Sequence, residues 1–142
     1  MNKVALKRIG FAEQNETNDQ WVMQQEEEQQ RSGSVMLADP SIRLFKSIDQ
    51  ETAQITEELN VDASGTRYRQ QVQFTVRTPD DRALAKRYER RPLVMHVWTV
   101  DGNHYKIGTK SYPAYMQQTK TNSRETVETA ITVEYETLTP II

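Results

Sequence analysis

The stretch from Leu93 to Gly108, LVMHVWTVDGNHYKIG, constrains the fold more than any other part of the chain. Its first half, Leu93–Val100, is almost entirely apolar and rich in strand-favouring residues, and a second short β-prone run follows Asp101-Gly102. An Asp-Gly pair between two such runs favours a tight hairpin turn, because the turn requires positive φ angles that glycine adopts without strain. Successive side chains of a strand point to opposite faces, so this strand is apolar on both. We therefore expect a β-hairpin whose first strand lies inside the sheet and is covered on both sides.

The composition indicates a single domain that is somewhat polar for its size. The chain has 142 residues, of which 36% are hydrophobic and 27% charged, and its net charge is −2. A chain of this length can bury a core of its own. The near balance of charge argues against a protein held to DNA mainly by a basic surface. The absence of cysteine excludes disulfides, thiolate metal sites and cysteine nucleophiles.

Neither a membrane span nor a signal peptide is indicated. A membrane-spanning helix needs about 20 consecutive apolar residues, and no run in the chain approaches that length. The first residues, MNKVALKRIGF, include basic side chains but no apolar region followed by a cleavage site. We expect no membrane partner.

Composition divides the chain, which we expect to be one domain over residues 1–142, into an arm, a core and a tail. Residues 12–34 are polar almost throughout, and their central QQEEEQQR has no apolar stripe on which a helix could dock. We predict a projecting arm or long loop there, because a structureless segment of this length is usually functional or disordered. Residues 35–138 are predicted to form a compact β-rich core, and residues 139–142 a short terminal tail.

Alternation of apolar and polar residues predicts further strands. It is weak at the N-terminus and cleanest after the Ala63-Ser64-Gly65 turn, where one face is apolar and the other carries arginine and glutamine. The expected strands are 3–11, 51–62, 66–78 and 125–138, and a polar loop is expected over 110–124.

A single helix is predicted at about 79–91. Thr78 can cap its N-terminus, Pro79 suits the first helical position, and the pair Asp80-Asp81 favours the positive end of the helix dipole. Arginines crowd its far end and Pro92 stops it. Runs of strands with one separate helix indicate an α+β fold. We expect a mainly antiparallel β-sheet with the helix on one face, or a small sandwich with the helix covering one open end.

His96 and His104 flank the Asp101-Gly102 turn and are the two histidines of the chain. A register in which the imidazoles face each other would let them bind a metal with Asp101 nearby, but no third ligand is evident. His96 occupies a core-facing strand position, which favours a structural role. We predict neither a metal site nor a cofactor, and the role of the two histidines stays open.

Catalytic residues are not predicted. Asp80 and Asp81 are explained as helix-start residues, and the other carboxylates lie on the solvent faces of strands, away from the apolar setting that acid catalysis requires. Ser64 and Ser111 lack the surroundings of a nucleophilic serine. Five glycines and no Walker or G-x-G-x-x-G sequence leave little room for a loop that binds phosphate. We therefore expect a protein that is not an enzyme.

Two groups of basic residues would be able to contact phosphate. The helix group is Arg82, Lys86, Arg87, Arg90 and Arg91, and the strand group is Arg67, Arg69 and Arg77. The favoured interpretation is that both groups pair with glutamates of 125–136 or with Glu26–Glu28, within the chain or on a neighbour, because acidic residues are equally numerous. Opposite charges on separate faces also suit copies packed side by side in a ring.

Isolated apolar residues in polar surroundings are candidate partner contacts. Trp21, Val22 and Met23 form the one apolar cluster of the arm, and an aromatic anchor of this kind is typical of residues that dock into a partner. Ile141 and Ile142 close the chain as a second possible hook. With Arg87 and Arg90, these residues are the predicted contacts.

A recognisable series of strands and turns runs from about Thr52 to Ile142. It resembles a group of small virion structural proteins of tailed bacteriophages, especially phages of gut bacteria, placed at the tail and the head–tail junction. The features that carry the resemblance are the helix ending in Arg90-Arg91, the strand Pro92–Val100, the turn Asp101-Gly102, the segment Lys106–Thr109, the final strand Thr129–Thr137 and the closing Leu138-Thr139-Pro140. These are strand-and-turn patterns without a catalytic signature, so no functional residue is carried over.

The resemblance implies a non-enzymatic building block of a ring or tube, located in the virion after synthesis in the host cytoplasm. Its expected partners are copies of itself and other virion structural proteins, with nucleic acid present only as packaged genome passing through the assembly. The alternative is a nucleic-acid-binding or regulatory module that uses the arginine-rich helix, whose binding would fall steeply with salt.

Overall fold

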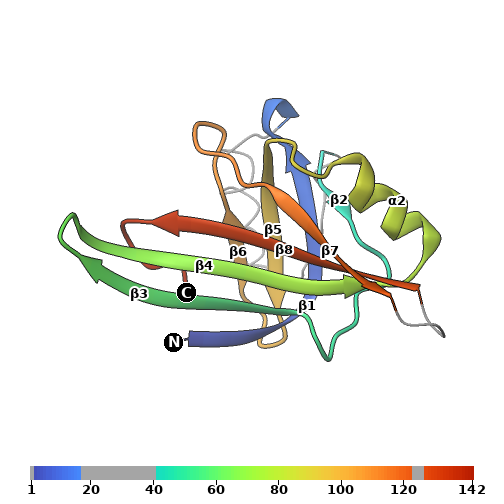
Figure 1. Ribbon diagram of the computed structural model, residues 1–142, viewed down its shortest axis with the longest axis horizontal. Coiled ribbons are helices and arrows are strands. Elements are labelled where there is room, and N and C mark those ends of the chain that lie inside the picture. Colours follow the sequence, from blue (N-terminus) through green and yellow to red (C-terminus); the bar gives the residue numbers. More distant parts are fainter. Residues whose placement is uncertain (1, 17–40, 123–126) are drawn as a thin grey trace, which may run out of the picture.

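The computed structural model describes residues 2–16, 41–122 and 127–142 (Figure 1). Its strands are β1 (Asn2–Glu13), β2 (Arg43–Leu44), β3 (Gln54–Asp62), β4 (Gly65–Val76), β5 (Leu93–Thr99), β6 (His104–Ile107), β7 (Met116–Asn122) and β8 (Val127–Thr137). The helical elements are the 3-10 turn η1 (Gln14–Glu16) and the α-helix α2 (Pro79–Arg87). The predicted α+β class, with a mainly antiparallel sheet and one α-helix, is confirmed. No helix within the described ranges is long and apolar enough to cross a membrane.

One bent sheet contains all eight strands, and β1 connects its two halves. The order is β6-β5-β1-β3-β4-β8-β7, with β2 also paired to β1, and every pairing is antiparallel. Asn2–Ala5 of β1 pairs with β3, whereas Leu6–Glu13 pairs with β5 after a register shift between Leu6 and Arg8. In Figure 1, β3, β4, β8 and the start of β1 run across the view, and the rest of β1, β5 and β6 run roughly perpendicular to them. The two halves therefore pack as nearly orthogonal layers.

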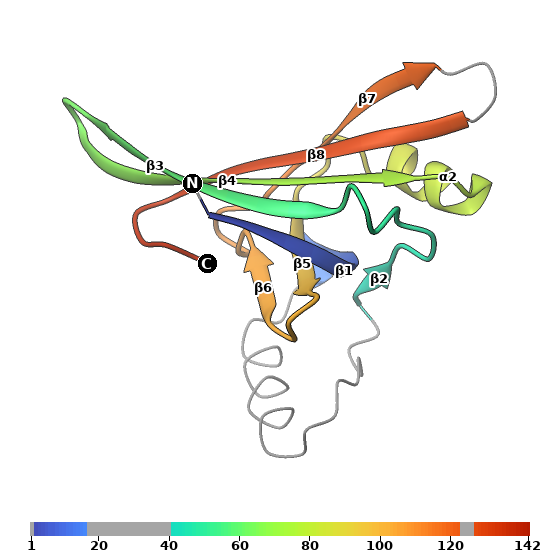
Figure 2. The ribbon, with the colours of Figure 1, turned by 90° about the horizontal axis from the view of Figure 1, so that it is seen from below.

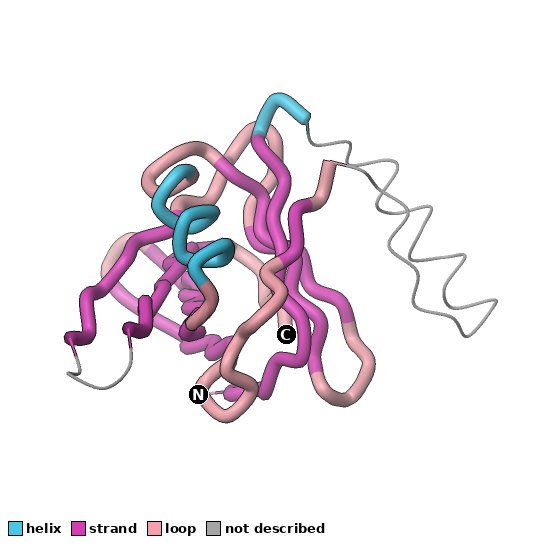
Figure 3. The backbone as a smooth tube through the Cα atoms, turned by 90° about the vertical axis from the view of Figure 1, so that its right-hand side faces the viewer, coloured by secondary structure: helices cyan, strands magenta, loops and turns pink. Residues whose placement is uncertain are grey.

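The core lies between these layers and is closed at one end by α2. Phe11 of β1 has its ring centroid 5.6 Å from that of Phe45 and 5.1 Å from that of Tyr88, and Phe45 lies 5.1 Å from Phe74 of β4. These contacts join both layers to the end of the helix. Figure 3 shows α2 at one open end of the bent sheet, where its two halves part.

The start of α2 is fixed by its own side chains. Thr78 caps the helix and accepts a hydrogen bond from the Asp81 amide at 3.4 Å. Asp81 is 2% exposed and accepts hydrogen bonds from the amides of Lys46 and Ser47 and from the Ser47 hydroxyl. The predicted aspartate pair thus divides into an exposed residue, Asp80, and a buried one that ties the helix to the connection between β2 and β3.

The helix ends at Arg87, one turn before the predicted end at 91. The Tyr88 amide donates the last helical hydrogen bond, to Leu84 at 3.2 Å. Arg90 then adopts a φ of 60°, the left-handed conformation in which helices commonly terminate. This bend places Arg90 and Arg91 in the connection to β5 rather than on the helix.

The predicted loop and the predicted start of the arm also differ from the structure. The expected polar loop over 110–124 contains β7, a strand that pairs with β8 from Met116 to Asn122. The expected arm also begins later, because Ala12, which is 1% exposed, and Glu13 belong to β1 and are followed by η1. The remainder of the predicted arm, with Trp21, Val22 and Met23, lies outside the described residues.

Candidate functional site

His96, which is buried, and His104, which is partly exposed, form a pair on the β5–β6 hairpin. His96 Nδ1 lies 3.0 Å from His104 Nε2, and the His104 ring stacks on Trp98 at 4.6 Å. His96 is 1% exposed, and burial, followed by the nearby His104 and Lys106, lowers its pKa from 6.5 to about 3. Asp101 accepts a hydrogen bond from the Thr99 hydroxyl. His96 Nδ1 and His104 Nε2, which would otherwise be able to bind a metal, are therefore engaged with each other. The part of the chain that is described also holds no group of three His, Asp or Glu able to bind a metal.

The two carboxylate pairs at 80–81 and 57–58, both within the described residues, do not converge on a cavity. Asp81 is engaged by main-chain amides, as described above, and Asp80 is exposed. Glu57 and Glu58 point to opposite faces of β3, with Glu57 buried and Glu58 exposed. Glu57 accepts a hydrogen bond from Gln70 Nε2 at 2.9 Å and from the amides of Ile141 and Ile142 at 2.7 and 3.4 Å. Asp81 and Glu57 stabilise the fold through these bonds, and neither pair is arranged for acid–base catalysis.

The arginines of β4 and its end pair with acidic residues of the same chain. Arg69 lies 2.8 Å from Glu134, Arg67 lies 3.5 Å from Glu136, and Arg77 lies 2.9 Å from Glu128 and 3.1 Å from Asp49. The glutamates belong to β8, the neighbour of β4 in the sheet. The predicted pairing within the chain is confirmed for this group. Each pair is partly exposed, so its contribution to stability is small.

The basic residues of α2 behave differently. Arg87 and Arg91 lie over the Tyr88 ring at 5.4 and 5.8 Å, and Arg43 of β2 lies 5.3 Å away and donates from Nε to the Tyr88 hydroxyl at 3.0 Å. Arg43 also approaches Glu16 at 3.9 Å. Among the residues that the structure describes, no ion pair involves Arg82, Lys86, Arg87, Arg90 or Arg91. The glutamates of β8, one of the partners predicted for them, are used by the strand arginines instead.

A two-stranded ribbon projects from the opposite side of the fold. It consists of residues 58–67, in which the end of β3 pairs with the start of β4 around the turn at Ala63-Ser64. The pairing of β1 with β3 stops at Glu57, and the pairing of β8 with β4 starts at Tyr68. Both outer edges of the ribbon are consequently free of partners in the described structure. Figures 1 and 2 both show it extending beyond the layers.

The ribbon carries apolar side chains on the face that continues the core. Leu59 and Val61 follow Ile55 and Glu57 on one face of β3, yet Leu59 is 54% and Val61 is 71% exposed, whereas Ile55 is fully buried. The C-terminal tail explains the boundary, because Ile141 and Ile142 pack on the core and their amides bond to Glu57. Beyond Glu57 none of the described residues covers this face.

The structure brings together only some of the predicted contact residues. Arg87 and Arg90 lie near each other at the end of α2, whereas Ile141 and Ile142 lie against their own core. A contact of this tail with a neighbour would require it to detach from Glu57. From the sequence alone, Leu59 and Val61 cannot be told apart from covered residues, because they continue the apolar alternation of Ala53 and Ile55. Their exposure depends on where neighbouring strands stop, which the local sequence does not encode.

Comparison with protein-family models, with curated proteins and with solved structures finds no match for this chain. The assignment of function therefore rests on the chain's own residues and surfaces.

Proposed function

We propose that this protein is a structural subunit of a tailed-bacteriophage virion, assembling with copies of itself into a ring or tube at the tail or the head–tail junction. The observation that carries the proposal is the β3–β4 ribbon, which exposes Leu59 and Val61 beside two open strand edges. The resemblance of residues 52–142 to such proteins, described above, supports the same function. On this proposal the protein is not an enzyme, and its partners are other copies and other virion proteins.

The physical argument concerns the stability of the ribbon. An isolated two-stranded ribbon is marginally stable in water, and long free edges invite pairing with other chains. Alternating charged residues such as Glu58 protect one face, but the face with Leu59 and Val61 has no such protection. Burying these two side chains against another copy would contribute roughly 1.5–3 kcal/mol each. In a closed ring the contact is repeated between neighbouring copies. The contact that closes the ring forms within one assembly, at a high effective concentration, and this strengthens the assembly further.

The first prediction is that the purified protein forms a discrete multimer of six or more copies. Replacing Leu59→Ser and Val61→Ser together should shift it toward monomer without changing its unfolding midpoint by more than a small amount, because both side chains are exposed. Native mass spectrometry and light scattering across a concentration series would measure the change. The matched control is Val100→Ser with Tyr112→Ser, since these side chains are 62% and 74% exposed but lie outside the ribbon.

Two results would contradict the proposal. One is a wild-type protein that stays monomeric at every concentration. The other is a multimer that loses mass equally in the ribbon variant and in the control variant.

A second candidate function, nucleic-acid binding, is favoured by the helix arginines that lack ion pairs in the described ranges. It predicts DNA binding that weakens steeply with salt and is lost on Arg87→Glu or Arg90→Glu, because phosphate contacts release counterions. A filter-binding or fluorescence-anisotropy titration at two salt concentrations distinguishes this function from self-assembly.

A further inference from the structure

We infer that assembly joins two unlike surfaces, with the β3–β4 ribbon of one copy docking on the arginine surface at the end of α2 of the next copy. The arginine surface is defined by Arg87, Arg90, Arg91 and Tyr115. This inference rests on the proposed function and names the two sides of the contact.

One face of the ribbon is apolar, and the other carries Glu58 and Asp62 together with Arg67 and Arg69 of the opposing strand. Leu59 and Val61 occupy the first face, and Glu58 and Asp62 occupy the second. Hydrogen bonds from the Ser64 side chain and amide to Asp62 lower the pKa of that carboxyl, so it is charged at neutral pH. Neither carboxylate has an ion pair among the described residues. The nearby Arg67 and Arg69 are already paired with Glu136 and Glu134 of β8.

The arginine surface combines cationic side chains with an exposed aromatic ring. The Arg90 amide donates to the Met116 carbonyl at 3.1 Å, and the Leu93 amide donates to the Ala114 carbonyl at 2.9 Å. These two bonds hold the segment containing Tyr115, which is 46% exposed, beside Arg90 and Arg91. Its acidic neighbours in the described structure are Glu89 on the same connection and Glu13 near Arg91.

Two of the arginines are positioned before any partner arrives. Arg87 and Arg91 lie over Tyr88, whose ring is 2% exposed and packed against Phe11. Guanidinium groups held on a buried ring lose less side-chain entropy when they bind a carboxylate. An arginine surface of this kind is suited to carboxylates presented on a rigid element.

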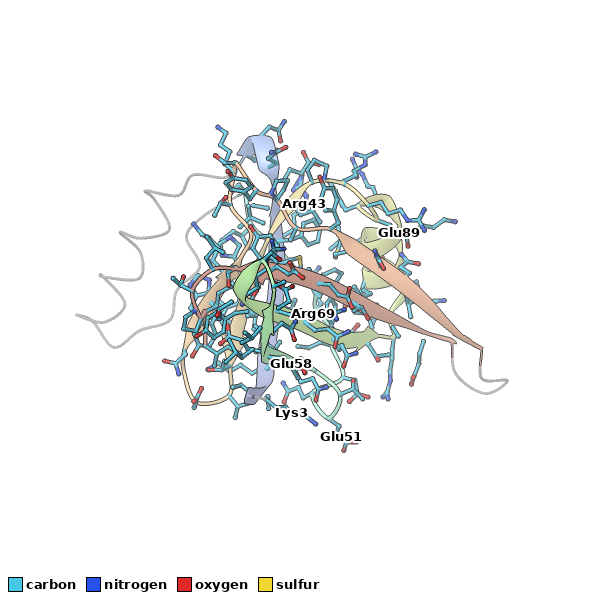
Figure 4. The ribbon with its side chains drawn as sticks, turned by 60° about the vertical axis from the view of Figure 1, so that its left-hand side comes forward. Lys3, Arg43, Glu51, Glu58, Arg69 and Glu89 are labelled. Atoms are coloured by element: carbon cyan, nitrogen blue, oxygen red, sulfur yellow. The ribbon has the colours of Figure 1, made fainter. Side chains whose placement is uncertain are left out.

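The two surfaces complement each other in charge and in apolar character. The ribbon offers Leu59 and Val61 on one face and, on the other, two carboxylates that have no ion pair among the described residues. The arginine surface offers the Tyr115 ring and three guanidiniums, so each component has a counterpart. The surfaces are well separated within one copy, as Figures 1 and 2 show for the ribbon and α2. Figure 4 labels Glu58 and Arg69 of the ribbon near the centre of the view, and Glu89 above and to one side of them, next to α2. A contact between them must therefore join different copies head to tail, the type of contact that closes into rings or continues as a tube.

The test uses two variants that each block one surface. Leu59→Lys with Val61→Lys blocks the ribbon, and Arg87→Glu with Arg91→Glu blocks the arginine surface. Each variant alone should be monomeric by native mass spectrometry, with the circular dichroism of the wild type. A mixture of the two should form a one-to-one dimer, because each variant retains the surface that the other lacks. The mixture is measured at a protein concentration above the one at which the wild type assembles. A dimer held by a single contact is weaker than a closed ring, in which every contact supports the others.

The outcomes separate this inference from the proposed function. If the arginine variant assembles like wild type while the ribbon variant is monomeric, the ribbon docks elsewhere and the inference is wrong, but the proposed function stands. A mixture that stays monomeric also contradicts it, because the contact then joins like surfaces or other residues. If the arginine variant keeps the oligomeric mass of the wild type but loses salt-sensitive DNA binding, the arginine surface binds nucleic acid and not the ribbon. A monomeric wild type would overturn the proposed function itself.

Discussion

His96 is the buried titratable side chain whose charge state has the clearest consequence for stability. Its pKa falls from 6.5 to about 3 in the fold, first because burial disfavours the charged ring and then because His104 and Lys106 are close. The folded state therefore binds fewer protons than the unfolded chain between these two values. Stability from this group is fully present above pH 6.5 and is lost as the pH falls toward 3.

The prediction is a fall in the free energy of unfolding of roughly 2 kcal/mol between pH 7 and pH 5, at about 1.4 kcal/mol per pH unit below 6.5. Denaturant titrations at several pH values would measure it. The comparison protein is His96→Gln, which cannot take up this proton and should show a correspondingly shallower slope. An identical slope in the two proteins would mean that other groups account for the pH dependence.

The C-terminal tail illustrates how one carboxylate connects two elements. Glu57 is 4% exposed and receives hydrogen bonds from Gln70 of β4 and from the amides of Ile141 and Ile142. Removing the last two residues would leave a buried carboxylate with one of three donors and would uncover the core beside it. Both effects destabilise the folded state.

We expect deletion of Ile141 and Ile142 to lower the free energy of unfolding by about 2–4 kcal/mol. Thermal and urea unfolding would measure the loss, and Leu138→Ser, at a side chain that is 79% exposed, provides a control that should change little. Unchanged stability together with impaired assembly would instead support the sequence-based prediction that this tail reaches a neighbour.

Elements with strong local patterns could be predicted from the sequence. The β5–β6 hairpin follows from Asp101-Gly102 between β-prone runs, and the start of α2 follows from Thr78 and the residues after it. The facing histidines were also foreseeable, since the turn pairs Trp98 with His104 and brings His96 within reach. These features depend on residues close together in the chain.

Other features depend on distant parts of the chain and could not be predicted. β7 reads MQQTKTN, which lacks an apolar alternation because the strand lies at the edge of the sheet. The end of α2 at Arg87 was missed because the arginines after it favour a helix end without fixing its position. The ribbon was missed because its projection depends on where β1 and β8 stop pairing, and that is a property of the assembled sheet.

The whole molecule depends on β1, because this strand belongs to both layers. Its first residues pair with β3 and the rest pair with β5, and Leu6 lies at the change, fully buried, with its amide bonded to the Ala53 carbonyl at 3.0 Å. A destabilising substitution at this position therefore affects the packing of both layers. The two layers should therefore unfold as one cooperative unit.

Leu6→Ala is predicted to lower the free energy of unfolding by about 2–5 kcal/mol, as expected for a large-to-small change in a core. Native-state hydrogen exchange would then show equal decreases in the opening free energies of slow amides in β4 and in β5, although these strands lie in different layers. Val100→Ala, at an exposed position, should leave both unchanged. A decrease confined to β5 would mean that the layers open separately and that β1 does not couple them. Equal decreases would mean that the ribbon extends from a cooperative body, the rigid support that a docking element requires.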